Sequence, residues 1–386
     1  MVVSTDRVKH ITAGLACAAA CAVVLLHAEP SADAVREGLQ LCGTSVLPSL
    51  FPMMFLAQYF VKSGGAEEAG RLLEGAARVL FGLPGVCGAV ILTGLVGGYP
   101  AGAAAAEALV NSGVISRRQG ERLTNIAFCS GPGFTIGMVG AQLYQNKMIG
   151  LLILTAQALS CIIIGIASKV LASHSDDRTA VSGRNSVSQG GGRDSSRNAF
   201  VGAVSAASSA VLTMCGFIIL FHVINAILGI LGTNEFLARC LAPIGLDEWG
   251  RYLLPCVTEV TGGSILSVKL GLPFTAFVVG FGGLSVHFQN FALCRAIGMN
   301  KVRYLVTRIA QGGICAALVS AALRLPYFAE ICTPASAMIG GEIPVRFSDV
   351  SGSFGALMLV MCLMSVICLP ERPMGYLPSR KKGMLS

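Results

Sequence analysis

Charged residues are scarce in this chain of 386 residues. Asp, Glu, Lys and Arg make up only 12% of it, whereas a soluble globular domain carries about 25%. Apolar runs recur instead, and roughly 20 apolar residues suffice to cross the hydrocarbon core of a membrane. The runs cover residues 11–28, 44–61, 148–167, 200–231, 304–323 and 353–369. The composition excludes an ordinary soluble domain and predicts an all-α polytopic membrane protein.

Motifs for nucleotide hydrolysis, hydrolytic catalysis and metal binding are also missing. No GxxxxGK[ST] phosphate-binding loop, HExxH or GxSxG motif occurs. The 14 cysteines form no CxxC pair and lie mostly in apolar runs, where a free cysteine behaves as a small hydrophobe. Cys17 and Cys21 share a helix face, but a metal pair there is the less favoured interpretation. We predict a protein that is not an enzyme and binds no cofactor or metal.

Composition divides the chain into five parts. Residues 173–199 are rich in Ser, Gly, Arg and Asp, which predicts a flexible cytoplasmic linker. N-terminal transmembrane helices (1–62) and a first repeat (63–172) precede the linker, and a second repeat (200–330) follows it. For residues 331–386 we expect an extracytoplasmic loop, a last transmembrane helix and a basic cytoplasmic tail.

The two repeats resemble each other in sequence. NKMIGLLILTAQALSC (146–161) aligns without a gap with NKVRYLVTRIAQGGIC (300–315), and upstream GGYPAG (97–102) lies opposite EVTGG (259–263). A weak internal repeat in a membrane protein is typical of transporter folds.

Basic residues predict that the two repeats enter the membrane from opposite faces. RLLEGAAR (71–78), SRRQGER (116–122) and CRAIGMNKVR (294–303) all fall in the cytoplasm if residues 86–111 and 252–270 are re-entrant hairpins. Both termini are then cytoplasmic. We attribute the net charge of +8 to Lys and Arg in cytoplasmic loops and therefore predict no nucleic-acid partner. The predicted fold is an inverted repeat of two units with re-entrant hairpins and broken helices.

Glycine and proline, with some serine and threonine, interrupt the apolar segments at four places, within residues 97–102, 130–133, 258–263 and 282–285. A broken helix leaves unpaired N–H groups at one tip and C=O groups at the other, and the N-terminal tips favour anionic groups. We therefore predict a substrate-binding pocket at mid-membrane, with packing glycines as the alternative. The predicted lining residues are Gly98, Tyr99, Pro100, Gly102, Asn125, Ser130, Gly131, Pro132, Glu259, Thr261, Gly263, Ser285, His287 and Gln289.

Two of these residues are ionisable. A carboxylate such as Glu259 costs roughly 3 kcal/mol or more at membrane depth unless it is paired or solvated. We predict that Glu259 binds substrate, an ion or a proton, and the alternative is an ion pair with Lys269 or Arg295. His287 could relay protons or hydrogen-bond an aromatic ligand, or it could simply bond between helices.

The motifs GYPAGA (98–103), SGP (130–132) and GGLSVHFQ (282–289) together resemble the YlbJ-type sporulation integral membrane proteins, which are built from two nucleoside-recognition, or Gate, domains. The resemblance covers most of the chain, residues 40–330. It implies a multi-pass protein of the mother-cell or outer forespore membrane. It also implies a role in moving dipicolinate, or a similar small metabolite, from the mother cell towards the forespore.

We therefore expect a secondary carrier or facilitator for a small anionic or heteroaromatic metabolite, with dipicolinate as the leading candidate. Two alternatives remain open: a non-transporting scaffold in spore-envelope assembly, and a nucleoside or ion permease. The expected partners are the small-molecule substrate, the lipid bilayer and other spore-membrane proteins.

Overall fold

A computed structural model describes residues 5–172 and 196–328, and helices dominate this part of the chain, in which no β-strand occurs. Four helices there are long and apolar enough to span a membrane, and a bent pair (His10–Leu26 with Ala28–Val46) can provide a fifth. The four are Lys147–Ala172, Ala199–Ile230, Leu272–Leu293 and Lys301–Ala322. The predicted class of all-α membrane protein is confirmed. The predicted last span and tail (331–386) and most of the predicted linker lie outside the described residues.

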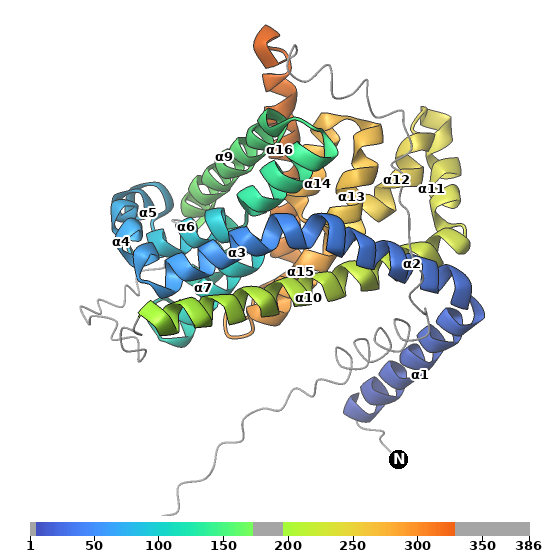
Figure 1. Ribbon diagram of the computed structural model, residues 1–386, viewed down its shortest axis with the longest axis horizontal. Helices are drawn as coiled ribbons and strands as arrows, with labels where there is room; N and C mark the ends of the chain where they lie inside the picture. Colours follow the sequence, from blue (N-terminus) through green and yellow to red (C-terminus); the bar gives the residue numbers. More distant parts are fainter. Residues whose placement is uncertain (1–4, 173–195, 329–386) are drawn as a thin grey trace, which may run out of the picture.

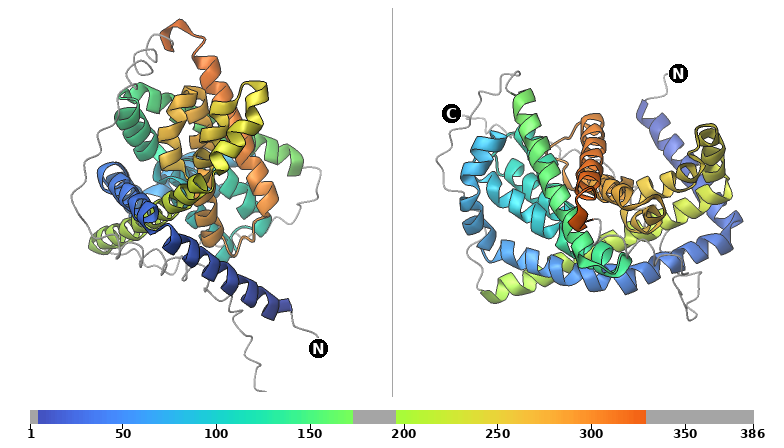
Figure 2. Two further views of the ribbon diagram at one scale, coloured as in Figure 1. Left: turned by 90° about the vertical axis from the view of Figure 1, so that its right-hand side faces the viewer. Right: turned by 90° about the horizontal axis from the view of Figure 1, so that it is seen from above.

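The N-terminal region differs from the prediction. The apolar runs predicted two separate helices, at about 10–28 and 44–62, and no structure between them. Instead α1 (Thr5–Leu26) bends by 93° into α2 (Ala28–Leu41), which continues through a π-helical stretch (Cys42–Val46) into α3 (Leu47–Lys62). The polar segment α2 is helical because it is amphipathic and packs its apolar face, with Ala34 and Val35, against α10 (Ser196–Ile230). Figures 1 and 2 show α2, α3 and α10 side by side.

Helix α10 begins at Ser196, inside the predicted linker (173–199), so helical structure starts before the predicted boundary at residue 200. Short helices precede each predicted hairpin, and a one-turn helix follows the second. They are α4 (Gly65–Leu72), α5 (Glu74–Phe81), α11 (Thr233–Leu241), η3 (Ala242–Ile244) and η4 (Val268–Leu270).

Both predicted repeats contain the same order of elements: an interrupted hairpin, an interrupted crossing and a long return helix. In the first repeat these are α6 (Cys87–Gly97) with α7 (Tyr99–Asn111), α8 (Arg117–Ile126) with the π-helix η2 (Gly133–Leu143), and α9 (Lys147–Ala172). In the second they are α12 (Asp247–Thr258) with α13 (Val260–Ser267), α14 (Leu272–Phe281) with α15 (Gly283–Leu293), and α16 (Lys301–Ala322). The inverted orientation itself stays a prediction at this point.

The two return helices, α9 and α16, pack against each other. Helix α16 packs against both α9 and α14 (Figures 1 and 2). Where α16 meets α9, the Cys315 thiol donates to the Ser160 hydroxyl at 3.4 Å. Ser160 and Cys315 are both fully buried, so this contact lies inside the protein.

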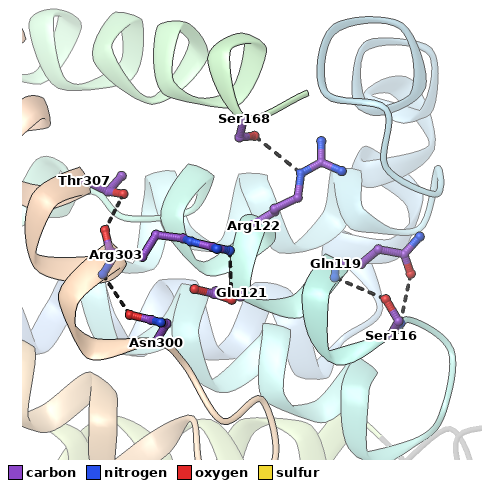
Figure 3. A network of polar contacts seen from close by, with 8 residues as sticks. All are labelled: Ser116, Gln119, Glu121, Arg122, Ser168, Asn300, Arg303 and Thr307. Carbon is purple, nitrogen blue, oxygen red and sulfur yellow. Dashed lines mark hydrogen bonds and ion pairs between the residues drawn. The ribbon is translucent and has the colours of Figure 1, made fainter. Parts of the chain in front are cut away.

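The basic segments predicted to share one side of the membrane lie together at one end. Glu121 of α8 forms an ion pair with Arg303 of α16 at 3.8 Å (Figure 3). Arg122 donates to the Phe81 carbonyl and, at 3.5 Å, to Ser168 near the end of α9. These contacts join the start of α8, the end of α9, the end of α5 and the start of α16.

A second link at this end connects the two repeats. The Glu107 carboxylate of α7 accepts the backbone N–H groups of Ala296 at 2.6 Å and Ile297 at 3.1 Å, just beyond α15. The open end of the first hairpin therefore contacts the end of the second crossing. At a different place, Tyr144, after η2, bonds Thr275 of α14 at 2.7 Å, and Ser267 of α13 donates to Thr275 at 2.9 Å.

Candidate functional site

The two interruptions of the first repeat touch each other through their backbones. The break between α6 and α7 is at Gly98 (φ +84°), and the break between α8 and η2 includes Gly131 (φ +77°). A Cβ added to Gly98 would lie 3.1 Å from the Ser130 carbonyl oxygen, and one added to Gly131 would lie 3.2 Å from the Gly98 nitrogen. Only glycine permits so close an approach of two main chains.

The two interruptions of the second repeat also touch each other. Glu259, with extended backbone (φ −140°, ψ 127°), separates α12 from α13, and Gly282 and Gly283 separate α14 from α15. A Cβ on Gly283 would lie 2.8 Å from the nitrogen of Val260. The sequence placed this hairpin break over Thr261, Gly262 and Gly263 as well. Those residues are helical, because the chain turns at Glu259 instead.

The two pairs of interruptions meet at a junction formed by Tyr99 and Phe128. Their rings lie 4.5 Å apart between centroids, and the Tyr99 hydroxyl donates to the Val279 carbonyl of α14. A Cβ on Gly282 would lie 2.7 Å from Phe128 Cζ and 3.6 Å from Tyr99 Cε1. All four interruptions that the sequence predicted therefore come together, and we call this region the junction.

Glu259 neutralises a helix end within the junction. Its side chain is 1% exposed, and its carboxylate accepts the N–H groups of Thr261 at 2.9 Å and Gly262 at 2.6 Å. The carboxylate thus caps α13, where the helix dipole is positive. Neither cation considered as its partner pairs with it among the described residues, and Lys269 donates to Tyr252 at 3.4 Å. The N-terminal tip that we predicted to be open to an anion already holds the protein's own anion.

His287 closes the break between α14 and α15. Its Nε2 donates to the Phe281 carbonyl at 2.8 Å, and its ring packs edge-on against Phe281 and Tyr304, with centroids 4.6 and 5.3 Å away. The bond lies within one broken helix, whereas the alternative considered above placed it between helices.

The other predicted residues have several different roles. Gly102 and Gly263 have packing contacts, because an added Cβ would lie 2.6 Å from the Ala127 carbonyl oxygen and 2.7 Å from that of Cys256, respectively. Ser130 both donates to and accepts from Gln157 of α9: its N–H donates to Oε1 at 2.9 Å, and its hydroxyl accepts from Nε2 at 2.9 Å. The buried side chains that complete this set are Asn125, Thr261, Ser285 and Gln289. Pro100 and Pro132 lie at the starts of α7 and η2, where a missing N–H costs little.

Sequence reasoning missed Arg308, which the structure places in the junction. Arg308 is fully buried, and its Nη2 donates to both the backbone oxygen and Oδ1 of Asn125 at 3.1 Å. Its Nη1 donates to Gln311, whose amide in turn donates to the Phe128 carbonyl at 2.8 Å. The guanidinium lies 4.1 Å from the Phe128 ring centroid and 5.3 Å from that of Tyr304. Arg308 thus caps the C-terminal carbonyl end of α8, as Glu259 caps the N-terminal end of α13.

His222 and Asn225 of α10 were missed as well. Asn225 Oδ1 accepts the Thr258 hydroxyl at 2.8 Å. A Cβ on Gly262 would lie 3.3 Å from His222 Nε2 and 3.4 Å from Glu259 Oε2, so the imidazole and the carboxylate face the same small space. Both missed pairs, 222 with 225 and 308 with 311, have a spacing of three residues in an apolar helix. That spacing places two polar groups on one helix face, a signal present in the sequence.

Comparison with known proteins gives one clear relative. The chain matches no family model and no solved structure. It is 27% identical over 326 residues to a protein of Bacillus subtilis (strain 168), and the match covers 77% of this chain and 79% of the relative. That relative is described as "Sporulation integral membrane protein YlbJ". The comparison confirms what the junction motifs indicated: over most of its length, this chain resembles the YlbJ-type sporulation integral membrane proteins.

Proposed function

We propose that the protein is a secondary carrier or facilitator for a small anionic or heteroaromatic metabolite, and not an enzyme. The observation that carries this proposal is the meeting of four helix interruptions at the junction. In transporters with broken helices, the substrate binds where such half-helices meet, because their ends present polar backbone groups inside the membrane. Two buried charged side chains, Glu259 and Arg308, lie at these ends.

We further infer that the two repeats cross the membrane in opposite directions. The first hairpin opens at the end where Glu107 meets Ala296 and Ile297, and α8 and α16 begin there. The second hairpin ends beside Thr275, near the exit of η2 at Tyr144. This arrangement supports the prediction that both termini are cytoplasmic.

The chemistry of the junction favours an aromatic acid as cargo. Phe128 and Tyr304 face the Arg308 guanidinium, and the rings of Tyr99 and His287 pack against Phe128. The similarity to a sporulation protein makes dipicolinate the leading candidate, moved from the mother cell towards the forespore. On this proposal the protein lies in the mother-cell or outer forespore membrane, where other spore-membrane proteins are its expected neighbours.

Transport can be tested directly with the purified protein in lipid vesicles. We expect labelled dipicolinate to enter protein-containing vesicles faster than protein-free ones, and unlabelled dipicolinate to compete better than uridine. Faster uptake of uridine than of dipicolinate would favour the nucleoside permease. If neither probe enters, while the protein still supports spore formation in a host lacking its own copy, the carrier is wrong and the scaffold is favoured.

Tyr99 provides a specific prediction for this assay. Tyr99→Ala removes both the contact with Phe128 and the bond to the Val279 carbonyl, so we expect dipicolinate uptake to fall by roughly tenfold or more. Tyr99→Phe keeps the ring and should have a smaller effect. Tyr252→Phe, which removes a hydroxyl bonded to Lys269 outside the junction, is the matched control. Uptake unchanged in Tyr99→Ala would place the cargo route elsewhere.

A further inference from the structure

Arg308 differs from the other buried charge in its bonding. Glu259 and Arg308 are the buried carboxylate and guanidinium of the described residues. The Glu259 carboxylate is satisfied by two N–H groups. In contrast, no carboxylate pairs with Arg308 in residues 5–172 and 196–328, and its Nε is buried without a hydrogen-bond partner there. The carbonyl groups and ring faces around Arg308 offset part of its charge, but no neighbouring group neutralises it.

A second buried polar atom without a hydrogen-bond partner belongs to Asn290, which, like Arg308, contacts Tyr304. The Nδ2 of Asn290 donates to the Tyr304 hydroxyl at 2.9 Å, and its Oδ1 is buried without a partner. Tyr304 also packs under the guanidinium of Arg308. An unpaired donor and an unpaired acceptor therefore flank one aromatic ring. Buried polar atoms are nearly always bonded, so such a pair points to a missing ligand.

The charge is specific to the second repeat. In the gap-free alignment of the return helices, Leu154 lies opposite Arg308, whereas Gln157 lies opposite Gln311. Both glutamines bond the interruption after α8, so the polar scaffold is duplicated and the cation is not. A symmetric structural role predicts a matching cation in both repeats. One cation at a shared junction is suited to binding one anionic group.

We propose that Arg308 binds a carboxylate group of the cargo through its Nε–H, and that Asn290 Oδ1 accepts a hydrogen bond from the same ligand. This inference rests on the proposed carrier function and names the residues that would bind the carboxylate of its aromatic cargo. Phe128 and Tyr304 hold the guanidinium plane, and Asn125 and Gln311 fix its other two nitrogens. The Nε edge is then aimed in a fixed direction before the ligand arrives, which lowers the entropic cost of binding.

The test compares two probes of one shape, dipicolinate and its uncharged diamide, by equilibrium binding to the purified full-length protein. The wild type is expected to bind dipicolinate about tenfold or more tightly than the diamide, because a hydrogen bond to a charged group is the stronger kind. In Arg308→Gln the ratio of the two affinities should fall to about one. Arg303→Gln, an exposed arginine of the same helix, should leave the ratio unchanged.

Each result decides a different point. If the wild type binds neither probe, the proposed cargo class fails, and this inference fails with it. If Arg308→Gln weakens both probes by the same factor, Arg308 only supports the fold; the inference is then overturned while the carrier stands. Should Arg308→Gln not fold, Arg308→Lys replaces it. The lysine variant is expected to lose affinity for dicarboxylate and keep that for the diamide, and equal losses would again overturn the inference.

Discussion

Gly283→Ala is expected to yield little folded protein and no transport. The residue has φ +72°, and its new methyl group would lie 2.8 Å from the Val260 nitrogen and 3.2 Å from the Glu259 carbonyl carbon. Left-handed backbone costs a residue with a side chain about 1–2 kcal/mol. The overlap adds to this cost, because both atoms it meets are backbone and the two interruptions must separate to make room. We expect a total loss above roughly 3 kcal/mol.

Gly298→Ala separates the two causes. Gly298 also has positive φ (+64°), but no atom lies within 4 Å of an added Cβ. The Gly298→Ala variant should therefore lose only about 1 kcal/mol of stability, the conformational cost of left-handed backbone. Thermal unfolding in detergent, followed by size-exclusion profiles and vesicle uptake, measures both variants. Equal melting temperatures for Gly283→Ala and Gly298→Ala would show that the two interruptions are not in contact.

Replacing Glu259 should produce the second large effect. Glu259→Ala removes the N-cap of α13 and leaves the N–H groups of Thr261 and Gly262, one buried and one part-buried, without this acceptor; the loss of a cap costs up to about 2 kcal/mol, and more where a donor stays buried and unpaired. Glu259→Gln keeps one carbonyl oxygen as acceptor and turns an amide N–H₂ towards the other donor. We therefore expect stability to fall in the order wild type, Gln, Ala, measured as melting temperature and as protein abundance in the host.

The control for Glu259 is Glu248→Gln, an exposed carboxylate in the first turn of α12. Surface changes of this kind usually stay within about 0.5 kcal/mol. Transport adds a second readout. If Glu259→Gln melts like the wild type but has lost uptake, its carboxylate acts on cargo or protons and not as a cap, and the capping role that we assign to it is wrong.

Local sequence was sufficient to predict three of the four helix breaks. Gly98, Pro100, Gly131 and the pair at 282–283 carry the interruptions in their own backbone preferences, which act over a few residues. The hairpin at 259 was placed up to four residues too far along the chain. There a side chain, not a glycine, ends the helix, since Glu259 bonds back to the next turn and lets Gly262 and Gly263 stay helical.

Residues on unbroken helices were harder to predict. Arg308 and His222 lie within long apolar runs, and their importance depends on which distant loops pack against α16 and α10. Asn125 and Arg308, 183 residues apart, meet only after both repeats have folded together. The helix α2, between the two predicted N-terminal helices, was missed for the same reason, because its amphipathic face acquires a partner only from α10.

In the proposed carrier, the two hydrogen bonds accepted by Glu107 restrict the route by which cargo could reach Arg308. They fasten α7 to the residues after α15, and these two helices pack directly against each other. A passage towards that face has to part the helices and break two charge-assisted bonds, each worth about 2 kcal/mol. In the proposed carrier, Glu107 would therefore hold that face closed, and breaking its two bonds would add to the barrier for any cargo that passes there.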